Sequence, residues 1–357
     1  MSVATNEWRP LNGVKVVEFD SPGGVTFAAR MLSGMGADVI RICRPGTSEP
    51  GPLALGREWA ALNLKTPQDR SLASRLIERA DVLLEGFRPG VMERLGLGPE
   101  QFHQSNPNLI YTRLSGWGQA GPRSDKAGHD LNYVAVSGLL DEMTPDGETP
   151  RIPPPLFADV AGGGHAALMG VLLALADKRT TARGCVLDVS MLDGVVSLLT
   201  PQWARRQRAG STAKLERPYY RLYQTADDRY LAVGCLEETF YRRFVATLGL
   251  DESLLPARHE PESWPELTAL FAQRISSRSL ADWEHVFSGV DACVTPVLTL
   301  SESQSEPQIA SRELLKEEDN EGPLLPVPAL RAVGQQVASR GRTRRLSTGE
   351  AAMKWAR

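Results

Sequence analysis

Short apolar runs alternate with helical patterns along the first 120 residues of the chain. The runs are typical of buried strands and lie at 14–19, 37–42, 59–65, 81–85 and 109–117. Helical patterns separate them at 27–36 and at 66–79, where Pro67 stands in the first turn. Parallel strands need crossover connections that helices usually supply, so the alternation predicts an α/β domain with a mostly parallel sheet. Ligands of such sheets collect at the carboxyl ends of the strands.

The chain changes character near residue 205. Before that point, a helical pattern at 165–179, a strand at 185–190 and a helix at 191–203 continue the α/β series. After a polar stretch, two β-like runs flank a turn at 221–235, and helical segments follow around 238–248, 264–275 and 280–287. We therefore predict a large domain over 1–204, a linker over 205–217 and a small α+β domain over 218–325. The segment 326–357 is expected to return to the large domain or to form a tail, and its basic end is typical of a solvated terminus.

Composition narrows the class of protein. The chain has 357 residues, of which 42% are hydrophobic and 23% charged, as in soluble globular proteins. Its net charge of −3 indicates no overall affinity for nucleic acid or for an anionic membrane. No run approaches the roughly twenty consecutive apolar residues of a membrane span, and the start MSVATNEW lacks the pattern of a secretory signal. We expect a cytoplasmic protein without membrane or nucleic-acid partners.

Two cofactor classes find no support in the sequence. Cys43, Cys185, Cys235 and Cys293 are scattered without metal-ligand spacing, which favours buried reduced thiols. The turn at 20–24 lacks the G-x-G-x-x-G pattern of a dinucleotide loop, so we interpret it as a structural turn and predict no NAD. No metal is expected.

A Gly-His-Asp triplet ending in Asp130 is followed by Asp159 and three glycines at 162–164. A histidine and a carboxylate placed in this way, here His129 and Asp159, can flank one substrate carbon as two proton-transfer groups. Asp159 is also in a position typical of a helix cap, and capping is compatible with catalysis. The glycines can let backbone approach a ligand and can open a helix whose N–H groups favour negative charge. The pattern points to acid–base chemistry on an anionic intermediate.

Eight segments of the chain resemble, in order, those of the family III CoA-transferase (CaiB/BaiF-like) superfamily and, within it, the α-methylacyl-CoA racemases. They are LNGVKVVEF, GADVIRICRPG, LNLKTP, ADVLLEGFRPGVMERLGLGP, YTRLSGWGQAGPRSDKAGHDLNY, PPPLFADVAGGG, DRYLAVGCLEETFY and DACVTPVL. Any one segment alone is a weak signal, whereas eight in the same order make a strong one. The resemblance implies a Rossmann-like large domain, a small domain, and an interlocked homodimer whose active sites combine the large domain of one chain with the small domain of the other.

The resemblance also implies the site residues. The catalytic set is His129, Asp159 and Glu237, and only the alignment separates Glu237 from its neighbour Glu238. Coenzyme A would bind through phosphate and adenine contacts of Arg44, Arg88 and Arg94, with Leu62, Lys65 and Gly86 lining the groove. CoA would enter as part of the substrate, and no cofactor would be bound permanently.

Three functions remain open from the sequence. The first is a racemase that interconverts (2R)- and (2S)-2-methylacyl-CoA by 1,1-proton transfer through an enolate, which the triplet and Glu237 favour. An exposed aspartate has a reference pKa near 3.9, so Asp159 would need burial to act as a useful base. The second is a family III CoA transferase in which Asp159 is the nucleophile. The third is an inactive CoA-thioester-binding protein. The acyl chain and the direction of the reaction stay undetermined.

Overall fold

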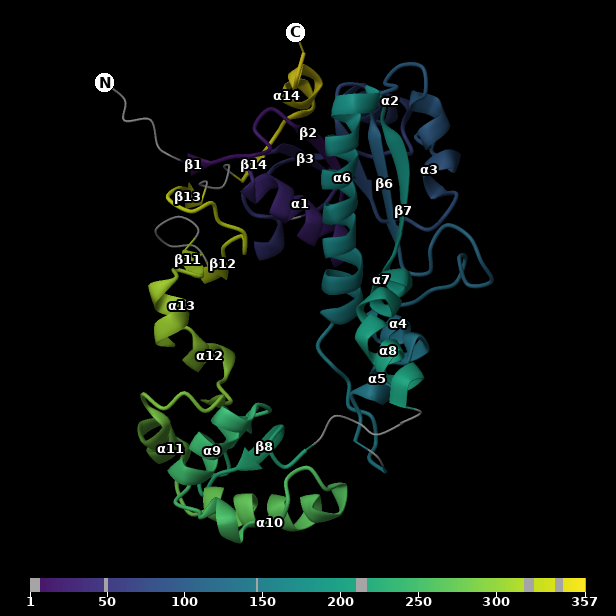
Figure 1. Cartoon of the computed structure of the whole chain (residues 1–357). Helices are drawn as coiled ribbons and strands as arrows, with labels where there is room; N and C mark the ends of the chain where they lie inside the picture. The colour runs from purple at the N-terminus through teal and green to yellow at the C-terminus, as the bar shows by residue number, and fades with distance from the viewer. Residues whose placement is uncertain are drawn as a thin grey trace, which may run out of the picture. The chain divides into compact units, whose positions relative to one another are not determined.

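Figure 1 shows a computed structural model of the chain, which describes residues 7–47, 51–145, 147–209, 217–317, 324–337 and 343–356. Contacts divide the chain into two units. The large unit comprises Met1–Ser211 and Glu313–Arg357, and the small unit comprises Thr212–Arg312. The hydrophobic cores are separate: the large unit has a core on each face of its sheet, and the small unit has one of its own.

A seven-stranded sheet forms the centre of the large unit. Its strands lie in the order β14-β4-β3-β2-β5-β6-β7, and all neighbouring pairs are parallel. Their bounds are Lys15–Phe19 (β2), Asp38–Cys43 (β3), Glu58–Ala61 (β4), Val82–Glu85 (β5), Ile110–Ser115 (β6), Cys185–Ser190 (β7) and Arg344–Arg345 (β14). The predicted parallel α/β architecture is confirmed.

Helices cover both faces of this sheet. α1 (Gly24–Gly34) and α6 (His165–Thr181) pack on one face, whereas α2 (Pro67–Glu78) and α14 (Thr348–Met353) pack on the other. Successive residues of a strand point to opposite faces of the sheet. In β2, Val16 therefore belongs to the core beneath α1 and α6, here called the first core, and Val17 to the core beneath α2 and α14, here called the second core. α2 begins as predicted, because the Thr66 side chain accepts a hydrogen bond from the N–H of Asp69.

Shorter elements complete the large unit. Its other helices are α3 (Val91–Arg94), α4 (Asp130–Ser137), α5 (Leu139–Glu142), α7 (Met191–Leu198) and α8 (Thr200–Ala209). Two strand pairs lie outside the main sheet, β1 (Glu7–Trp8) with β13 (Gln336–Val337) and β11 (Leu315–Glu317) with β12 (Leu324–Pro326). The start of the predicted linker, 205–217, is wrong, since α8 continues to Ala209; 210–216 lie outside the described residues.

The stretch 157–181 is one continuous helix. Its first part, Phe157–Gly164, has π-helical hydrogen bonding and leads directly into α6. The helix has 25 residues, and an 18-residue window within it has a mean hydropathy of 1.5, so by length and composition it is able to span a membrane. The expectation that no stretch is long and apolar enough is therefore wrong. Core helices of soluble proteins have the same properties, and here Leu168 and Val171 pack into the first core.

The C-terminal segment returns to the large unit. β14 pairs with β4 at the edge of the sheet, and Lys354 makes 2.7 Å ion pairs with Asp38 and Glu58. The described residues 343–356 are therefore a strand and a helix of the domain, and the interpretation of the basic end as a solvated terminus is wrong. The predicted end of the small domain, residue 325, is also too late, because β11 and β12 fall in the large unit, where Arg30 donates to the carbonyl of Pro326.

The small unit is built on the predicted hairpin. Strands β8 (Arg221–Gln224), β9 (Tyr230–Val233) and β10 (Val294–Pro296) form an antiparallel sheet. The helices are α9 (Glu238–Thr247), α10 (Trp264–Ile275), α11 (Leu280–Phe287), α12 (Leu300–Ser303) and α13 (Pro307–Ser311). Aromatic residues dominate its core, with Phe244 and Phe271 in edge-to-face contact at 5.1 Å.

Candidate active site

His129 lies immediately before α4. Its backbone is extended, and its N–H donates a 3.0 Å hydrogen bond to Oδ1 of Asn132, a residue of the first turn. This bond holds the backbone of His129, while the residue itself is exposed. The imidazole is therefore accessible to a substrate.

Asp130 connects the start of α4 to the start of the long helix. Its Oδ2 accepts hydrogen bonds from the N–H groups of Ala158 at 2.7 Å and Asp159 at 2.9 Å, and the residue is only 3% exposed. The first N–H groups of a helix have no partner within the helix, so a carboxylate from outside can take them. The structure thus brings His129 and Asp159 into one region, here called the acid–base corner. Asp130 was not predicted as a site residue, although it stands in the triplet.

The carboxyl group of Asp159 is half-buried. Burial raises its pKa above the ordinary value, the charge of Asp130 raises it further, and the charge of His129 lowers it. The raised pKa makes Asp159 a stronger base than an exposed aspartate, as its proposed role in proton transfer requires.

The turn at 20–24 forms one wall of the acid–base corner. A Cβ on Gly23 would lie 2.7 Å from Asp159 Oδ2, and a Cβ on Gly24 would lie 2.6 Å from the Asp159 carbonyl oxygen. These glycines precede and begin α1, so the amino end of that helix, where negative charge is favoured, lies next to the carboxylate. This turn was predicted to have a structural role only. The two successive glycines were the available signal that another group approaches the backbone there.

The glycines at 162–164 allow close packing between helices. A Cβ on Gly162 would lie 2.8 Å from the carbonyl oxygen of Met191, and a Cβ on Gly164 would lie 2.8 Å from the ring of Phe27. α7 crosses so closely that a Cβ on Gly194 would lie 1.9 Å from the Gly162 oxygen. The expectation that these glycines open a helix toward a ligand is wrong, since the helix begins earlier, at Phe157.

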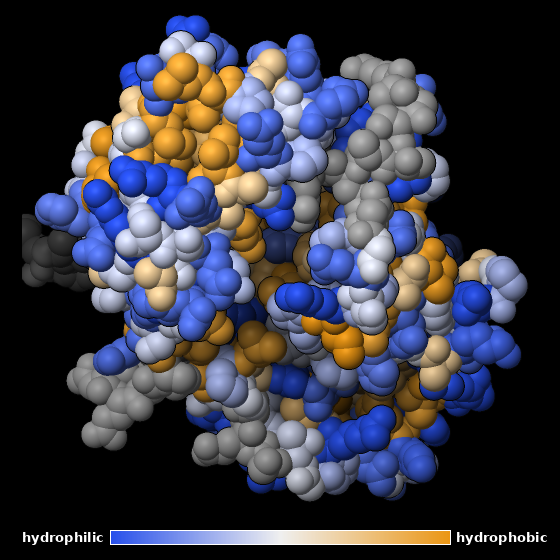
Figure 2. All heavy atoms as spheres, turned by 90° about the horizontal axis from the view of Figure 1, so that it is seen from below, coloured by the Kyte–Doolittle hydropathy of each residue, from blue (hydrophilic) through white to orange (hydrophobic). Residues whose placement is uncertain are grey.

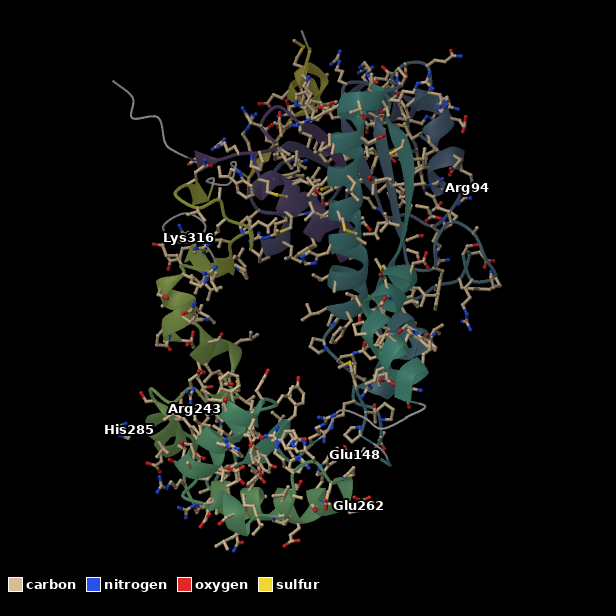
Figure 3. The ribbon with its side chains drawn as sticks, viewed as in Figure 1. Arg94, Glu148, Arg243, Glu262, His285 and Lys316 are labelled. Carbon is tan, nitrogen blue, oxygen red and sulfur yellow. The ribbon has the colours of Figure 1, made fainter. Side chains whose placement is uncertain are left out.

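Four predicted CoA contacts follow the carboxyl ends of parallel strands. Within the described ranges, none of them makes an ion pair, and all are exposed: Arg44, Lys65, Arg88 and Arg94. The acidic residues beside them are already occupied, because Arg113 pairs with Glu85 at 3.1 Å and with Glu93 at 2.8 Å. Figure 3 shows Arg94 on the outer side of α3. We call these four residues the cationic edge; they are available for phosphate groups.

The other two predicted CoA contacts have structural positions. Leu62 is 2% exposed and belongs to the second core, so its side chain does not line a groove. Gly86 allows the turn at 20–24 to approach, since a Cβ there would lie 2.4 Å from Ser21 Oγ. Neither residue therefore offers a side chain to a ligand.

The comparison with protein families decides the identity. The model described as "CoA-transferase family III" matches residues 11–347, almost the whole chain.

The chain belongs to CoA-transferase family III.

Characterised relatives include racemases and transferases. The chain is 42% identical over 300 residues to the α-methylacyl-CoA racemase of Mus musculus, which covers 82% of this chain and 79% of the relative. It is 29% identical over 332 residues to the acetyl-CoA:oxalate CoA-transferase of Acetobacter aceti, with 86% and 85% covered. A crystal structure of the Mycobacterium tuberculosis protein Rv3272 matches with a TM-score of 0.83 at 26% identity, over 98% of this chain and 99% of that one. The fold of this family III chain is thus shared over its length.

Glu237 and Glu238 lie side by side at the start of α9 in the small unit. Glu238 is engaged by two arginines, Arg242 at 2.9 Å and Arg258 at 3.5 Å. Glu237 is exposed, and it has no ion-pair partner in the part of the chain that the structure describes. Of the two carboxylates, Glu237 is therefore the one left open to a further partner.

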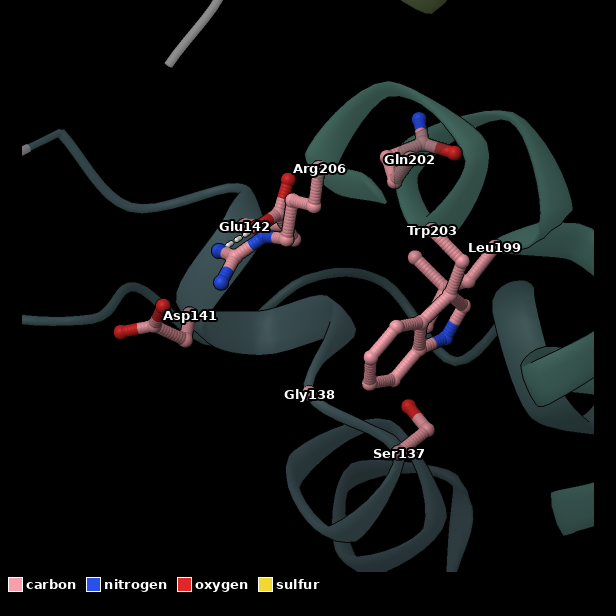
Figure 4. A pocket seen from close by; sticks show the side chains of 8 residues that line it. All are labelled: Ser137, Gly138, Asp141, Glu142, Leu199, Gln202, Trp203 and Arg206. Carbon is pink, nitrogen blue, oxygen red and sulfur yellow. Dashed lines mark hydrogen bonds and ion pairs between the residues drawn. The ribbon is translucent and has the colours of Figure 1, made fainter. Parts of the chain in front are cut away.

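A cavity lies in the large unit outside the acid–base corner. Its volume is about 150 Å³, and it is lined by eight residues of α4, α5 and α8 and of the segments next to them, shown in Figure 4: Ser137, Gly138, Asp141, Glu142, Leu199, Gln202, Trp203 and Arg206. Two of its charged groups, Glu142 and Arg206, pair with each other, and Glu142 also pairs with Arg205. Neither His129 nor Asp159 lines it, so the cavity is not the site of the proposed chemistry.

The large unit exposes apolar side chains on four helices. They are Val136 on α4, Met169 and Leu173 on α6, Val196 and Leu198 on α7, and Trp203 on α8, all between 42% and 63% exposed. Apolar patches are also visible on the face drawn in Figure 2. Large exposed apolar patches mark interaction sites in proteins. Among the described residues, no group of three or more potential ligands is arranged to hold a metal ion.

Proposed function

We propose that this family III protein is a racemase of 2-methylacyl-CoA thioesters that acts by 1,1-proton transfer through an enolate. The observation that carries the proposal is the hydrogen-bonded connection through Asp130, which brings His129 and Asp159 into one corner. The relatives from mouse and Homo sapiens named α-methylacyl-CoA racemase, at 42% and 41% identity, support the same reaction.

The reaction needs two groups on opposite sides of the α carbon. One removes the proton next to the thioester carbonyl, and the other returns a proton to the opposite face. The raised pKa of Asp159 suits it to accept a proton, and the exposed imidazole of His129 is able to donate one. In the reverse direction the two groups exchange roles.

The cationic edge would bind the CoA part of the substrate. Its unpaired guanidinium and ammonium groups fit the phosphates of CoA, and the contacts lie at the strand ends where α/β sheets bind ligands. Binding energy from this remote handle would hold the reacting carbon in the acid–base corner.

A homodimer would complete the site. We infer that the small unit of one chain supplies Glu237 to His129 of its partner, where a carboxylate would orient the imidazole and stabilise its protonated form. The exposed apolar side chains of α4, α6, α7 and α8 support burial against a second copy.

CoA transfer is the second candidate function. The transferase relative from Acetobacter aceti supports it, and Asp159, which lies against the amino end of α1, is a carboxylate able to form an acyl anhydride. An inactive CoA-binding protein is the third candidate; the His129 and Asp159 arrangement argues against it.

Incubation with a single epimer of a 2-methylacyl-CoA in deuterated water separates the three candidates. Racemisation with deuterium uptake at the α carbon, measured by chiral chromatography and mass spectrometry, is the result expected of the racemase. Transfer of CoA to an added free acid without exchange would overturn the proposal in favour of a transferase. Binding without either reaction would leave the CoA-binding protein.

A further inference from the structure

Tyr133 occupies a slot between two glycines. Its ring lies so close to the backbone at both ends of the loop 116–128 that a Cβ on Gly116 would fall 1.9 Å from the hydroxyl oxygen, and a Cβ on Gly128 would fall 2.8 Å from a ring carbon. Trp117 meets the ring edge-on at 4.7 Å between centroids. The two glycines thus make room for Tyr133, and the backbone on both sides together with Trp117 holds the ring in this position.

That position places Tyr133 against the acid–base corner. Tyr133 is three residues after Asp130 on α4, so the two side chains lie on one face of the helix. Tyr133 packs in one cluster with Ala158, whose N–H binds Asp130 and whose neighbour is Asp159. The charges of Asp159 and Arg88 both act on its hydroxyl, so this group lies within electrostatic range of the base and of one residue of the cationic edge.

The hydroxyl group of Tyr133 has no hydrogen-bond partner in the part of the chain that the structure describes. Tyr133 is 5% exposed, and the hydroxyl makes no hydrogen bond among the described residues, whereas the buried Tyr111 donates to the carbonyl of Leu97 at 2.9 Å. Its oxygen is not among the fully enclosed unpaired polar atoms, which include the neighbouring Trp117 Nε1. A buried phenol usually has a hydrogen-bond partner, so an accessible unpaired hydroxyl is suited to a ligand.

The enolate proposed above needs a hydrogen-bond donor, and two N–H groups at the start of the long helix are already in use. The N–H groups of Ala158 and Asp159, at the start of that helix, already donate to Asp130. Burial raises the pKa of Tyr133, the charge of Asp159 raises it further and that of Arg88 lowers it, so the group stays a neutral O–H donor at neutral pH.

We propose that the Tyr133 hydroxyl donates a hydrogen bond to the thioester oxygen and stabilises the negative charge that develops there when the α proton is removed. The inference rests on the proposed racemase function for its reaction, although the same donor would serve the oxyanion formed in CoA transfer. Donors of this kind, aimed at a developing oxyanion, contribute strongly to catalysis.

Tyr133→Phe is the direct test, because it keeps the ring between the glycines and removes only the hydroxyl. We expect kcat for deuterium exchange to fall by about 10²–10³-fold, with the affinity for CoA and the melting temperature unchanged. Tyr230→Phe, which removes the hydroxyl of a 43% exposed tyrosine on β9, is the matched control and should behave as wild type. Unchanged exchange in Tyr133→Phe, or a lower melting temperature without a loss of kcat, would overturn the inference.

A second measurement separates failure of the inference from failure of the proposed function. Acetoacetyl-CoA ionises to a stable enolate whose ultraviolet absorption reports its formation on the protein. We expect wild type to bind it and raise its enolate fraction, and Tyr133→Phe to bind it about tenfold or more weakly while CoA binding is unchanged. This readout needs no turnover, so equal enolate formation in both proteins overturns the role of Tyr133 even when wild type does not racemise. Absence of exchange by wild type would instead count against the racemase.

Discussion

The acid–base corner and the cationic edge are built in opposite ways. In the corner, Asp130 is buried and its carboxylate accepts hydrogen bonds from two backbone N–H groups, and Asp159 is held against the glycines at the start of α1. At the edge, Arg88 and Arg94 are exposed and have no ion-pair partner in the described ranges. The difference fits the proposed roles, in which the corner positions groups for chemistry and the edge keeps free charge for a ligand.

The C-terminal segment provides a second set of basic residues, which differs from the cationic edge. Arg344 pairs with Glu58 and Glu350, and Lys354 pairs with Asp38 and Glu58. These cations fasten β14 and α14 to the domain, so they are structural. Pairing within the chain, more than charge itself, separates the two kinds of basic residue.

The largest effect is expected from the proton-transfer groups. Asp159→Asn and His129→Ala should each lower α-proton exchange by about 10²–10⁴-fold, because each removes one of the two groups that the reaction needs. The affinity for CoA, measured by calorimetry, should stay within a few-fold of wild type. Near-normal exchange in either variant would remove that residue from the proposed mechanism.

Asp130→Asn tests whether the corner tunes its base by charge. The amide oxygen is able to keep the two backbone hydrogen bonds, but the negative charge that raises the pKa of Asp159 is lost. The pKa of Asp159 should fall, so its basic form should persist to lower pH. The acidic limb of the kcat/KM profile should therefore move to lower pH; no movement, or movement to higher pH, would contradict the assigned effect.

Removing charge from the edge should weaken binding without slowing the chemistry. Arg88→Ala should raise KM for the acyl-CoA by about tenfold or more, from the loss of a charge-assisted contact, while kcat at saturation changes little. Arg75→Ala is the matched control, since Arg75 is exposed on α2 and contacts only Ser71 Oγ among the described residues. Equal KM values for the two variants would show that Arg88 does not bind CoA.

The smallest effect is expected from the paired C-terminal cations. Lys354→Met should leave KM and kcat unchanged and lower stability by about 1 kcal/mol, measured by thermal unfolding. Burial alone would raise the pKa of Glu58, but hydrogen bonds from Lys354 and Arg344 outweigh it and the pKa is lowered. The stabilisation is thus present above the ordinary pKa of glutamate and is lost as pH falls through the lowered value. The difference between variant and wild type should therefore shrink in acid, and a constant difference would argue against the pair.

Much of the fold could be predicted because its signals are local. The apolar run at 14–19 and the Thr66-Pro67 start of α2 depend on neighbouring residues, and β2 and α2 lie where they were expected. The predicted start of the linker was wrong because a polar stretch resembles both a loop and an exposed helix such as α8. β14 has two residues and exists only through pairing with β4, which no local pattern shows.

The sequence alone determined the parallel α/β architecture and the candidate pair His129 and Asp159. Strand and helix periods and short motifs are properties of residues that are close together in the sequence. Only the tertiary structure decided that Asp130 binds the start of the long helix, that the glycine run serves packing and that Tyr133 fills a slot between Gly116 and Gly128. It also decided which arginines stay unpaired. These properties depend on which distant groups come within a few ångströms of one another, and that follows from the packing of the whole domain.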